Sequence, residues 1–193
     1  QCGTLVTWVE PLGSDNCQVA LLSTTSENGG FYPVGSSTVT YMIEDASGNS
    51  DEASFNITIT DTTNPQFMQV PNGISVSSDQ GDCGAIVTWL EVTASDNCAV
   101  ESITGTHASG DFFNKGLTVV EHTVTDIHGN QITQSFDINV TDNELPVITG
   151  IDQNLTIEND LGQCGANVTW QEPTASDNCE VTSLKIKVIK INC

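Results

Sequence analysis

The stretch LTVVEHTVTD (Leu117–Asp126), followed by IHGN and then QITQSFDINVTD (Gln131–Asp142), decides the fold class. In both runs β-branched residues alternate with polar ones, which is the period-2 pattern of a strand with one buried face. The Gly-Asn between the runs is a turn signal, so the pair is predicted to be a β-hairpin. Three shorter runs, at 73–78, 85–90 and 99–106, predict further strands, and no stretch shows the capped periodicity of a helix.

This hairpin belongs to a unit that recurs at a spacing of 81 residues. Three versions of one segment mark it: CGTLVTWVEPLGSDNC (2–17), CGAIVTWLEVTASDNC (83–98) and CGANVTWQEPTASDNC (164–179). A unit of this size can close its own core, unlike a shorter solenoid repeat. Short strands with frequent turns predict an all-β chain of tandem immunoglobulin- or fibronectin III-like antiparallel β-sandwich domains, joined as beads on a string.

The domain boundaries follow from the spacing. Residues 1–64 are predicted to be a repeat without its first strand, 65–145 a complete repeat, and 146–193 the N-terminal part of a third. The sequence is therefore expected to be a segment of a longer protein. Its last eleven residues, SLKIKVIKINC (183–193), match neither earlier copy, and no function is drawn from them or from Cys193.

One tryptophan recurs in the strand after the first cysteine of each repeat, as Trp8, Trp89 and Trp170. An aromatic side chain flanked by apolar alternation is expected to fill the space between two sheets. Packing is therefore favoured over carbohydrate stacking.

Six of the seven cysteines recur as pairs with one spacing, Cys2/Cys17, Cys83/Cys98 and Cys164/Cys179. Six cysteines allow about 15 connectivities, and a disulfide within each repeat is the simplest expectation. Such bridges predict an oxidising, extracellular or cell-surface location. Zinc is disfavoured, because each repeat offers two thiols and no recurring histidine where four ligands are needed.

The charge balance limits the partners. Four Lys and Arg residues face 25 Asp and Glu residues, which gives a formal net charge of −21. Nucleic acid and anionic membrane surfaces are therefore excluded as partners, and divalent cations are the natural counterions. No apolar run is long enough to span a membrane, so no direct membrane contact is expected from this segment.

The stretch FYPVGSSTVTYMIEDASGNSDEASFNITITDTTNP (Phe31–Pro65), together with the DNC motif, resembles the hyalin repeat (HYR) family. The resemblance covers essentially the whole chain. It implies an immunoglobulin-like fold and an extracellular adhesive or structural role without catalysis. The second repeat departs from the pattern with FFNKG (112–116) and DIHGN (126–130), but it keeps the glycine of each turn.

Acidic and amide residues recur in the SDN turn, in the hairpin turn and in the linker between repeats. In an immunoglobulin-like sandwich these three places meet at one end of the domain, and six to eight oxygen ligands suit Ca²⁺. Asp, Asn and Gly are also ordinary turn formers, so each motif alone has a purely structural explanation. The candidate ligands are Asp61, Asn64, Asp96, Asn97, Asp126 and Asn130 at the first junction, Asp142, Asn143, Glu144, Asp177 and Asn178 at the second, and Asp15, Asn16, Asp45 and Asn49 in the first repeat.

No catalytic residues are proposed. His107, His122 and His128 all lie in the middle repeat, none recurs, and we expect them at exposed strand or turn positions. No Cys-His or Ser-His-acid set has mutual support in the sequence. A Lys-Asn isopeptide staple is disfavoured because Lys115 has Val34 as its counterpart in the first repeat.

Four asparagines stand in an Asn-x-Thr context that predicts N-glycosylation in a secreted protein. Thr62, in Asp-Thr-Thr, is a candidate O-glycosylation position. The predicted acceptors are Asn56, Asn139, Asn154, Asn167 and Thr62.

The sequence thus predicts a non-catalytic segment of an extracellular filament, stalk or surface adhesin with calcium-stiffened domain junctions. Its partners would be other surface or matrix proteins, glycans, or copies of itself. The alternative is a module that recognises a glycan or protein through its loops. Exposure of Phe31, Tyr32, Phe112 or Phe113 on a loop would favour that alternative.

Overall fold

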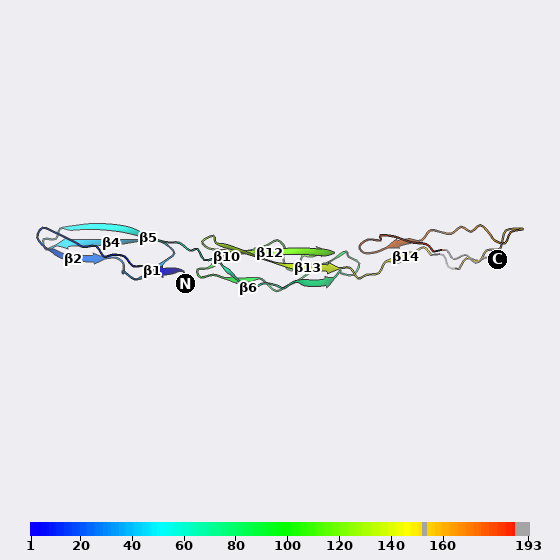
Figure 1. Ribbon diagram of the computed structural model, residues 1–193, viewed down its shortest axis with the longest axis horizontal. Helices are drawn as coiled ribbons and strands as arrows, with labels where there is room; N and C mark the ends of the chain where they lie inside the picture. Colours follow the sequence, from blue (N-terminus) through cyan, green and yellow to red (C-terminus); the bar gives the residue numbers. More distant parts are fainter. Residues whose placement is uncertain (152–153, 188–193) are drawn as a thin grey trace. The chain divides into compact units, whose positions relative to one another are not determined.

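The computed structural model describes residues 1–151 and 154–187, and the residues it describes contain strands but no helix (Figure 1). The chain forms two compact units. Unit 1 consists of Gln1–Val70, Val92–Gly105 and His122–Gln134. Unit 2 consists of Pro71–Glu91, Thr106–Glu121 and Ser135–Cys193. The division falls inside the second repeat, so each unit contains one junction between successive repeats.

The first repeat has two sheets. One pairs β1 (Gly3–Leu5) antiparallel with β3 (Phe31–Pro33). The other has the order β2-β4-β5, with β2 at Val19–Thr24, β4 at Gly35–Asp45 and β5 at Ser50–Ile59. These three strands lie side by side in Figure 1. The arrangement is that of an antiparallel sandwich.

The second repeat has the same plan and additional strands. Its main sheet has the order β10-β12-β13-β7, in which β7 runs parallel to β13. The smaller pairs are β8 with β11 and β6 with β9, and β14 pairs with β15 in the third repeat. The bounds are β6 Gln66–Gln69, β7 Ile74–Ser77, β8 Gly84–Ile86, β9 Thr93–Ser95, β10 Val100–Gly105, β11 Phe112–Asn114, β12 Gly116–Asp126, β13 Gln131–Thr141, β14 Val147–Thr149 and β15 Thr174–Ser176.

The predicted hairpin is confirmed as β12 and β13, and the predicted strands at 73–78 and 99–106 as β7 and β10. The predicted strand at 85–90 ends early, at Ile86. Beyond Ile86 the backbone bonds to a loop instead of a neighbouring strand. Ser109 accepts a hydrogen bond from the Trp89 N–H at 2.8 Å and donates one to the Trp89 carbonyl at 3.0 Å.

The same device appears in the first repeat, where Asn28 takes the place of Ser109. Its side-chain oxygen accepts from the Trp8 N–H at 2.9 Å, and its amide donates to the Trp8 carbonyl at 2.7 Å. A polar side chain therefore satisfies the backbone at the recurring tryptophan, where the strand pattern alone predicts a ladder.

Valine and isoleucine from the long strands form the core. Val39 in β4 and Val120, Val124 and Ile138 in β12 and β13 are completely buried. They alternate with more exposed residues, as expected of strands with one face against a core.

The predicted core role of the tryptophans is confirmed for Trp8 and Trp89. Trp8 packs against a core cluster that includes Tyr32 and Tyr41, and Trp89 meets Phe136 edge-on with ring centroids 5.4 Å apart. The prediction is wrong for Trp170, which is 47% exposed. The described residues between β14 and β15, where Trp170 lies, contain no strand to pack against it.

Two further expectations concern the histidines and the C-terminal tail. The prediction that the histidines are exposed is wrong for His122, which is 7% exposed in β12. The position of Cys193 lies outside the described residues, as does most of the lysine-rich tail.

Candidate cation site at the repeat junctions

The disulfides link successive repeats, so the predicted pairing within each repeat is wrong. Cys2 bonds to Cys98, and Cys83 bonds to Cys179, each across 96 residues. Cys164 is also disulfide-bonded, and it is not bonded to Cys179. The first cysteine of one repeat therefore joins the second cysteine of the next.

The length of the central strand explains the correction. The Cys2 carbonyl accepts from the Val34 N–H, next to the start of β4. Cys17 precedes β2, whose Val19 lies opposite Asp45, the last residue of β4. Eleven strand residues span about 35 Å, whereas a disulfide needs Cα atoms within about 7 Å. The two cysteines of one repeat thus lie at opposite ends of their domain.

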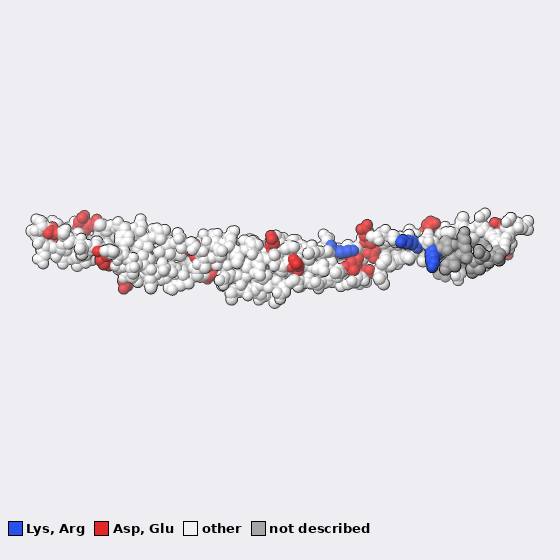
Figure 2. Space-filling model, in the orientation of Figure 1, with Lys and Arg blue, Asp and Glu red and all other residues white. Residues whose placement is uncertain are grey.

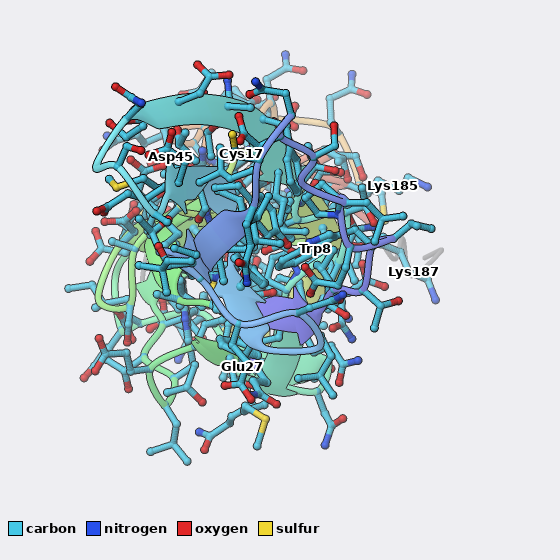
Figure 3. All side chains as sticks on the ribbon, turned by 90° about the vertical axis from the view of Figure 1, so that its left-hand side faces the viewer. Trp8, Cys17, Glu27, Asp45, Lys185 and Lys187 are labelled. Atoms are coloured by element: carbon cyan, nitrogen blue, oxygen red, sulfur yellow. A yellow bond between two sulfur atoms is a disulfide. The ribbon has the colours of Figure 1, made fainter. Side chains whose placement is uncertain are left out.

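Cys17 is the described cysteine left free, and it is exposed. Figure 3 shows its sulfur without a bond to a second sulfur. Cys17 occupies the position of Cys98 and Cys179 in the repeat.

The SDNC motif forms an Asx turn in all three copies. One carboxylate oxygen of Asp15, Asp96 and Asp177 accepts a hydrogen bond from the N–H of the following cysteine, at 2.8, 2.7 and 3.1 Å. The other carboxylate oxygen of Asp96 and Asp177 is buried, with no hydrogen-bond partner among the described residues. The SDNC motif therefore forms a turn, as its residue types predict. At each junction one carboxylate oxygen of its aspartate remains without a hydrogen-bond donor.

The amide that follows this aspartate is arranged in the same way at both junctions. At the first junction the Asn97 amide lies 3.4 Å from a carboxylate oxygen of Asp61. At the second, the Asn178 amide lies 3.4 Å from Asp142, the counterpart of Asp61. The side-chain oxygens of both asparagines are buried and unpartnered. At each junction, one oxygen of the aspartate and one of the asparagine are thus buried without a hydrogen-bond donor. Buried polar atoms without a partner are rare in proteins.

Asp61 is the centre of the first junction. Its side chain is 2% exposed, and one of its oxygens lies 3.2 Å from Nδ1 of His128. Carboxylate oxygens of Asp61 and Asp96 lie within 4.8 Å of each other. The pKa of Asp61 is lowered by the hydrogen bond from the Thr63 N–H, with further help from Asn97 and His128, against the effect of burial. The ionised form is therefore favoured, and the site is negatively charged.

The second junction has a different basic neighbour. Nζ of Lys115 lies 3.8 Å from Asp142, and the lysine side chain is 51% exposed. The Asn178 amide donates to the Asp82 carbonyl at 2.8 Å, and Glu144 accepts from the Gly81 N–H at 2.9 Å. Sequence reasoning missed His128 and Lys115 as junction residues, because neither recurs in the repeat.

The hairpin turns use their aspartates structurally. Asp126 is completely buried, and it accepts from the N–H of His128, the N–H of Asn130 and the Asn130 amide at 2.8 to 2.9 Å. Burial raises its pKa, but these hydrogen bonds outweigh that effect and lower it. Asp45 and Asn49 repeat the arrangement in the first repeat. In both turns the carboxylate already has its donors.

The remaining predicted ligands lie at the edge of the two sites or away from them. Asn130 reaches the first junction by donating to the Asp61 carbonyl at 3.3 Å. Asn143 bonds instead to Ser77, and Asn64 is exposed. Asp15 and Asn16 are exposed as well. The structure thus brings together Asp61, Asp96 and Asn97 with Asp126 and Asn130, and separately Asp142, Asp177 and Asn178 with Glu144.

A cavity of about 600 Å³ lies elsewhere, in the first repeat. Leu12, Gly13 and Ser14 line it, at the positions of β9 in the second repeat. There, β6 covers this edge by pairing with β9. The cavity is thus the place that an additional strand fills in the complete repeat.

The predicted glycosylation positions are mostly accessible. Asn56, Asn154, Asn167 and Thr62 are exposed, and Asn139 is half-buried. Their modification remains a prediction.

The HYR domain model matches residues 1–59 and 60–140, which is most of the chain. The chain belongs to the HYR domain family. It is 39% identical to hyalin of Lytechinus variegatus over 91% of the chain and 34% of that protein. It is 37% identical to hyalin of Strongylocentrotus purpuratus over 94% of the chain and 16% of that protein. This HYR chain thus spans about a third or less of the hyalins it matches.

A more distant relative is the sushi, von Willebrand factor type A, EGF and pentraxin domain-containing protein 1 of Rattus norvegicus. It is 33% identical over 66% of the chain and 4% of that protein. HYR domains occur in extracellular proteins, and this chain is an extracellular module. The family is not known for catalysis.

The described residues form no helix that is long and apolar enough to cross a membrane.

Proposed function

We propose that this HYR segment is a structural and adhesive part of an extracellular filament or stalk whose repeat junctions bind calcium. Its partners would be surface or matrix proteins, glycans, or further copies of the chain. The observation that carries the calcium proposal is the recurrence of unpartnered buried oxygens, on Asp96 and Asn97 and again on Asp177 and Asn178.

The donor set fits a hard cation. Asp61, Asp96 and Asn97 offer carboxylate and amide oxygens at the first junction, and Asp142, Asp177 and Asn178 offer the same set at the second. Ca²⁺ prefers such oxygen ligands and accepts irregular geometry. The thiols are unsuited to zinc, because Cys2 and Cys98 are bonded to each other.

Calcium would stiffen the junction, because its ligands come from both repeats. Asp61 follows the last strand of the first repeat, whereas Asp96 and Asn97 precede β10 of the second. An ion held by both would penalise bending between them. Figure 2 shows many acidic and few basic side chains on the visible face. Any cation would therefore reduce the repulsion between these acidic side chains, and a test must separate this general effect from binding at the junctions.

A glycan- or protein-binding loop is the alternative, and the aromatic residues favour the structural role. Tyr32 and Phe113 are buried, at 7% and 2% exposure. Phe31 and Phe112 are 44% and 49% exposed, but both lie in strands and not in loops. Their rings lie over the backbone of Gly3 and Gly84, which gives them a packing role.

The test is thermal unfolding of the full chain in calcium and in chelator, with magnesium at equal ionic strength as the screening control. A cation that binds the folded state alone stabilises it by about 2.7 kcal/mol at 100 times its Kd. We expect calcium to raise the Tm by several degrees, and Asp96→Asn to reduce the increase. Asp137→Asn is the matched control, because Asp137 is an exposed acid on β13 outside both junctions.

Small-angle scattering gives the second readout. Chelator should change the scattering of the wild-type chain and leave that of Asp96→Asn and Asp177→Asn together nearly unaffected. Equal stabilisation by magnesium, or an equal calcium response in Asp96→Asn and in the control Asp137→Asn, would contradict the proposal.

A further inference from the structure

The Cys2–Cys98 and Cys83–Cys179 disulfides enclose overlapping parts of the chain. The Cys2–Cys98 bridge closes one loop and the Cys83–Cys179 bridge closes the next. Only residues 83–98 belong to both loops. Successive bridges are therefore connected through this short segment.

We propose that this chain transmits tension along a short covalent path that bypasses its hydrogen-bonded hairpins. Pulled from its ends, the chain passes tension from Cys2 through the first bridge to Cys98. It then follows the peptide backbone back to Cys83 and crosses the second bridge to Cys179. The inference rests on connectivity alone, and it holds whether or not the junctions bind calcium.

The path leaves the long strands without tension. The β4–β5 hairpin lies in the segment between Cys2 and Cys83, and the β12–β13 hairpin lies between Cys98 and Cys179. Each of these segments is a side branch whose two ends are already connected by a shorter covalent route. Unfolding a hairpin therefore adds no length between the ends of the chain.

The gain in stiffness is large because the path per repeat is short. The step from Cys83 to Cys98 has about 15 residues and extends to about 50 Å, whereas a whole repeat of about 81 residues extends to about 280 Å. Pairing within each repeat would leave about 66 residues under tension per repeat, or about 230 Å. Inter-repeat bridges are thus the pairing that limits extension.

The shared segment is itself held at several points. The Cys83 carbonyl accepts from the Lys115 N–H at 3.0 Å, β8 pairs with β11, and Ser109 binds both backbone groups of Trp89. β9 pairs with β6 near its other end. The part of the repeat that would carry tension is therefore anchored to the domain along its length.

Single-molecule force spectroscopy with handles at both ends of the full chain tests the proposal. At high force the oxidised chain should reach a contour length of about 100 Å, and the chain treated with reductant about 670 Å. Pairing within repeats predicts about 510 Å for the oxidised chain. The contour length is read after unfolding, and non-reducing peptide mapping of each oxidised variant establishes beforehand which bridges have formed.

Two cysteine variants locate the effect. Removing the first bridge by Cys2→Ser with Cys98→Ser should lengthen the oxidised chain to about 340 Å. Cys17→Ser, the matched control, should leave it near 100 Å. Release of long segments from the oxidised wild-type chain, or no response to reductant, would overturn the proposal. Failure here leaves the calcium experiment unaffected, because that test reads thermal stability and scattering.

Discussion

At the scale of single residues, equivalent core positions of the first and second repeats hold different titratable side chains, Tyr41 in the first and His122 in the second. Both are 7% exposed. The Tyr41 hydroxyl accepts from Nε1 of Trp8 at 2.6 Å and donates to Glu10. Burial and the neighbouring Glu10 raise the pKa of Tyr41, so it stays neutral in ordinary buffers. His122 is the member of the pair that can become charged near neutral pH.

The second repeat should lose stability in mild acid through His122. Burial lowers the pKa of His122 below 6.5, so the unfolded chain binds the proton more readily than the folded one. The contribution of neutral His122 to the free energy of unfolding is therefore fully present above about pH 6.5. It is lost as the pH falls toward the pKa of His122 in the folded protein. Denaturant unfolding at pH 7.5 and pH 5 should show this loss, and His122→Tyr should make it smaller. Equal pH dependence in both proteins would contradict the assignment.

At the scale of elements, glycine fixes the contact between β8 and β11. Gly84 is buried, and a Cβ at this position would collide with the Phe112 ring and with the Phe113 carbonyl. Gly3 has the same relation to Phe31 in the first repeat. In the first two copies of the Cys-Gly pair, the cysteine forms a disulfide to another repeat and the glycine leaves room for an aromatic ring.

Gly84→Ala should destabilise the second repeat. The carbonyl that faces the added methyl group belongs to the backbone and cannot rotate away, and overpacking of this kind costs about 1–3 kcal/mol. Gly73→Ala is the control, because its Cβ would meet only the Asp137 carbonyl at an ordinary 3.7 Å. Chemical denaturation of the two variants measures the difference, and comparable stabilities would argue against the steric explanation.

At the scale of the whole molecule, the sulfur connectivity assigns each cysteine a different accessibility to reagents. Cys2, Cys83, Cys98, Cys164 and Cys179 are all disulfide-bonded. Cys17 is free and exposed. Successive repeats are therefore joined by covalent bonds that are independent of the linker between them.

Thiol labelling should reflect this connectivity. Without reductant, iodoacetamide should modify Cys17 while peptides containing Cys2 and Cys98 remain linked. Non-reducing peptide mapping by mass spectrometry reads both results in one experiment. A linked Cys2/Cys17 peptide would restore pairing within the repeat. A disulfide stabilises the folded chain by lowering the entropy of the unfolded one, and this effect grows with the length of the closed loop. The stabilisation per bridge is about 3 kcal/mol for the short loop within a repeat and about 4.7 kcal/mol for the long loop between repeats.

The sequence by itself determined the period, the long hairpin and the family. Alternation over Leu117–Asp126 and Gln131–Asp142 predicted the hairpin, because side chains of a strand point to opposite faces in turn. It also predicted that Asp61, Asp96 and Asn97 lie together, since recurring turns gather at one end of a sandwich. These features depend on the alternation of neighbouring residues and on the repeated motifs, and both can be read directly from the sequence.

Only the tertiary structure decided which cysteines meet. Cys2 and Cys17 are close in sequence, but β4 separates them by the length of the domain, while Cys98 arrives beside Cys2 from the next repeat. The spacing of the cysteines along the chain could not show which of them pair. A short extended segment spans a long distance, so two cysteines that are close in sequence can lie far apart in the fold. For the same reason the roles of His128 and Lys115 beside Asp61 and Asp142 were visible only once the repeats were folded together.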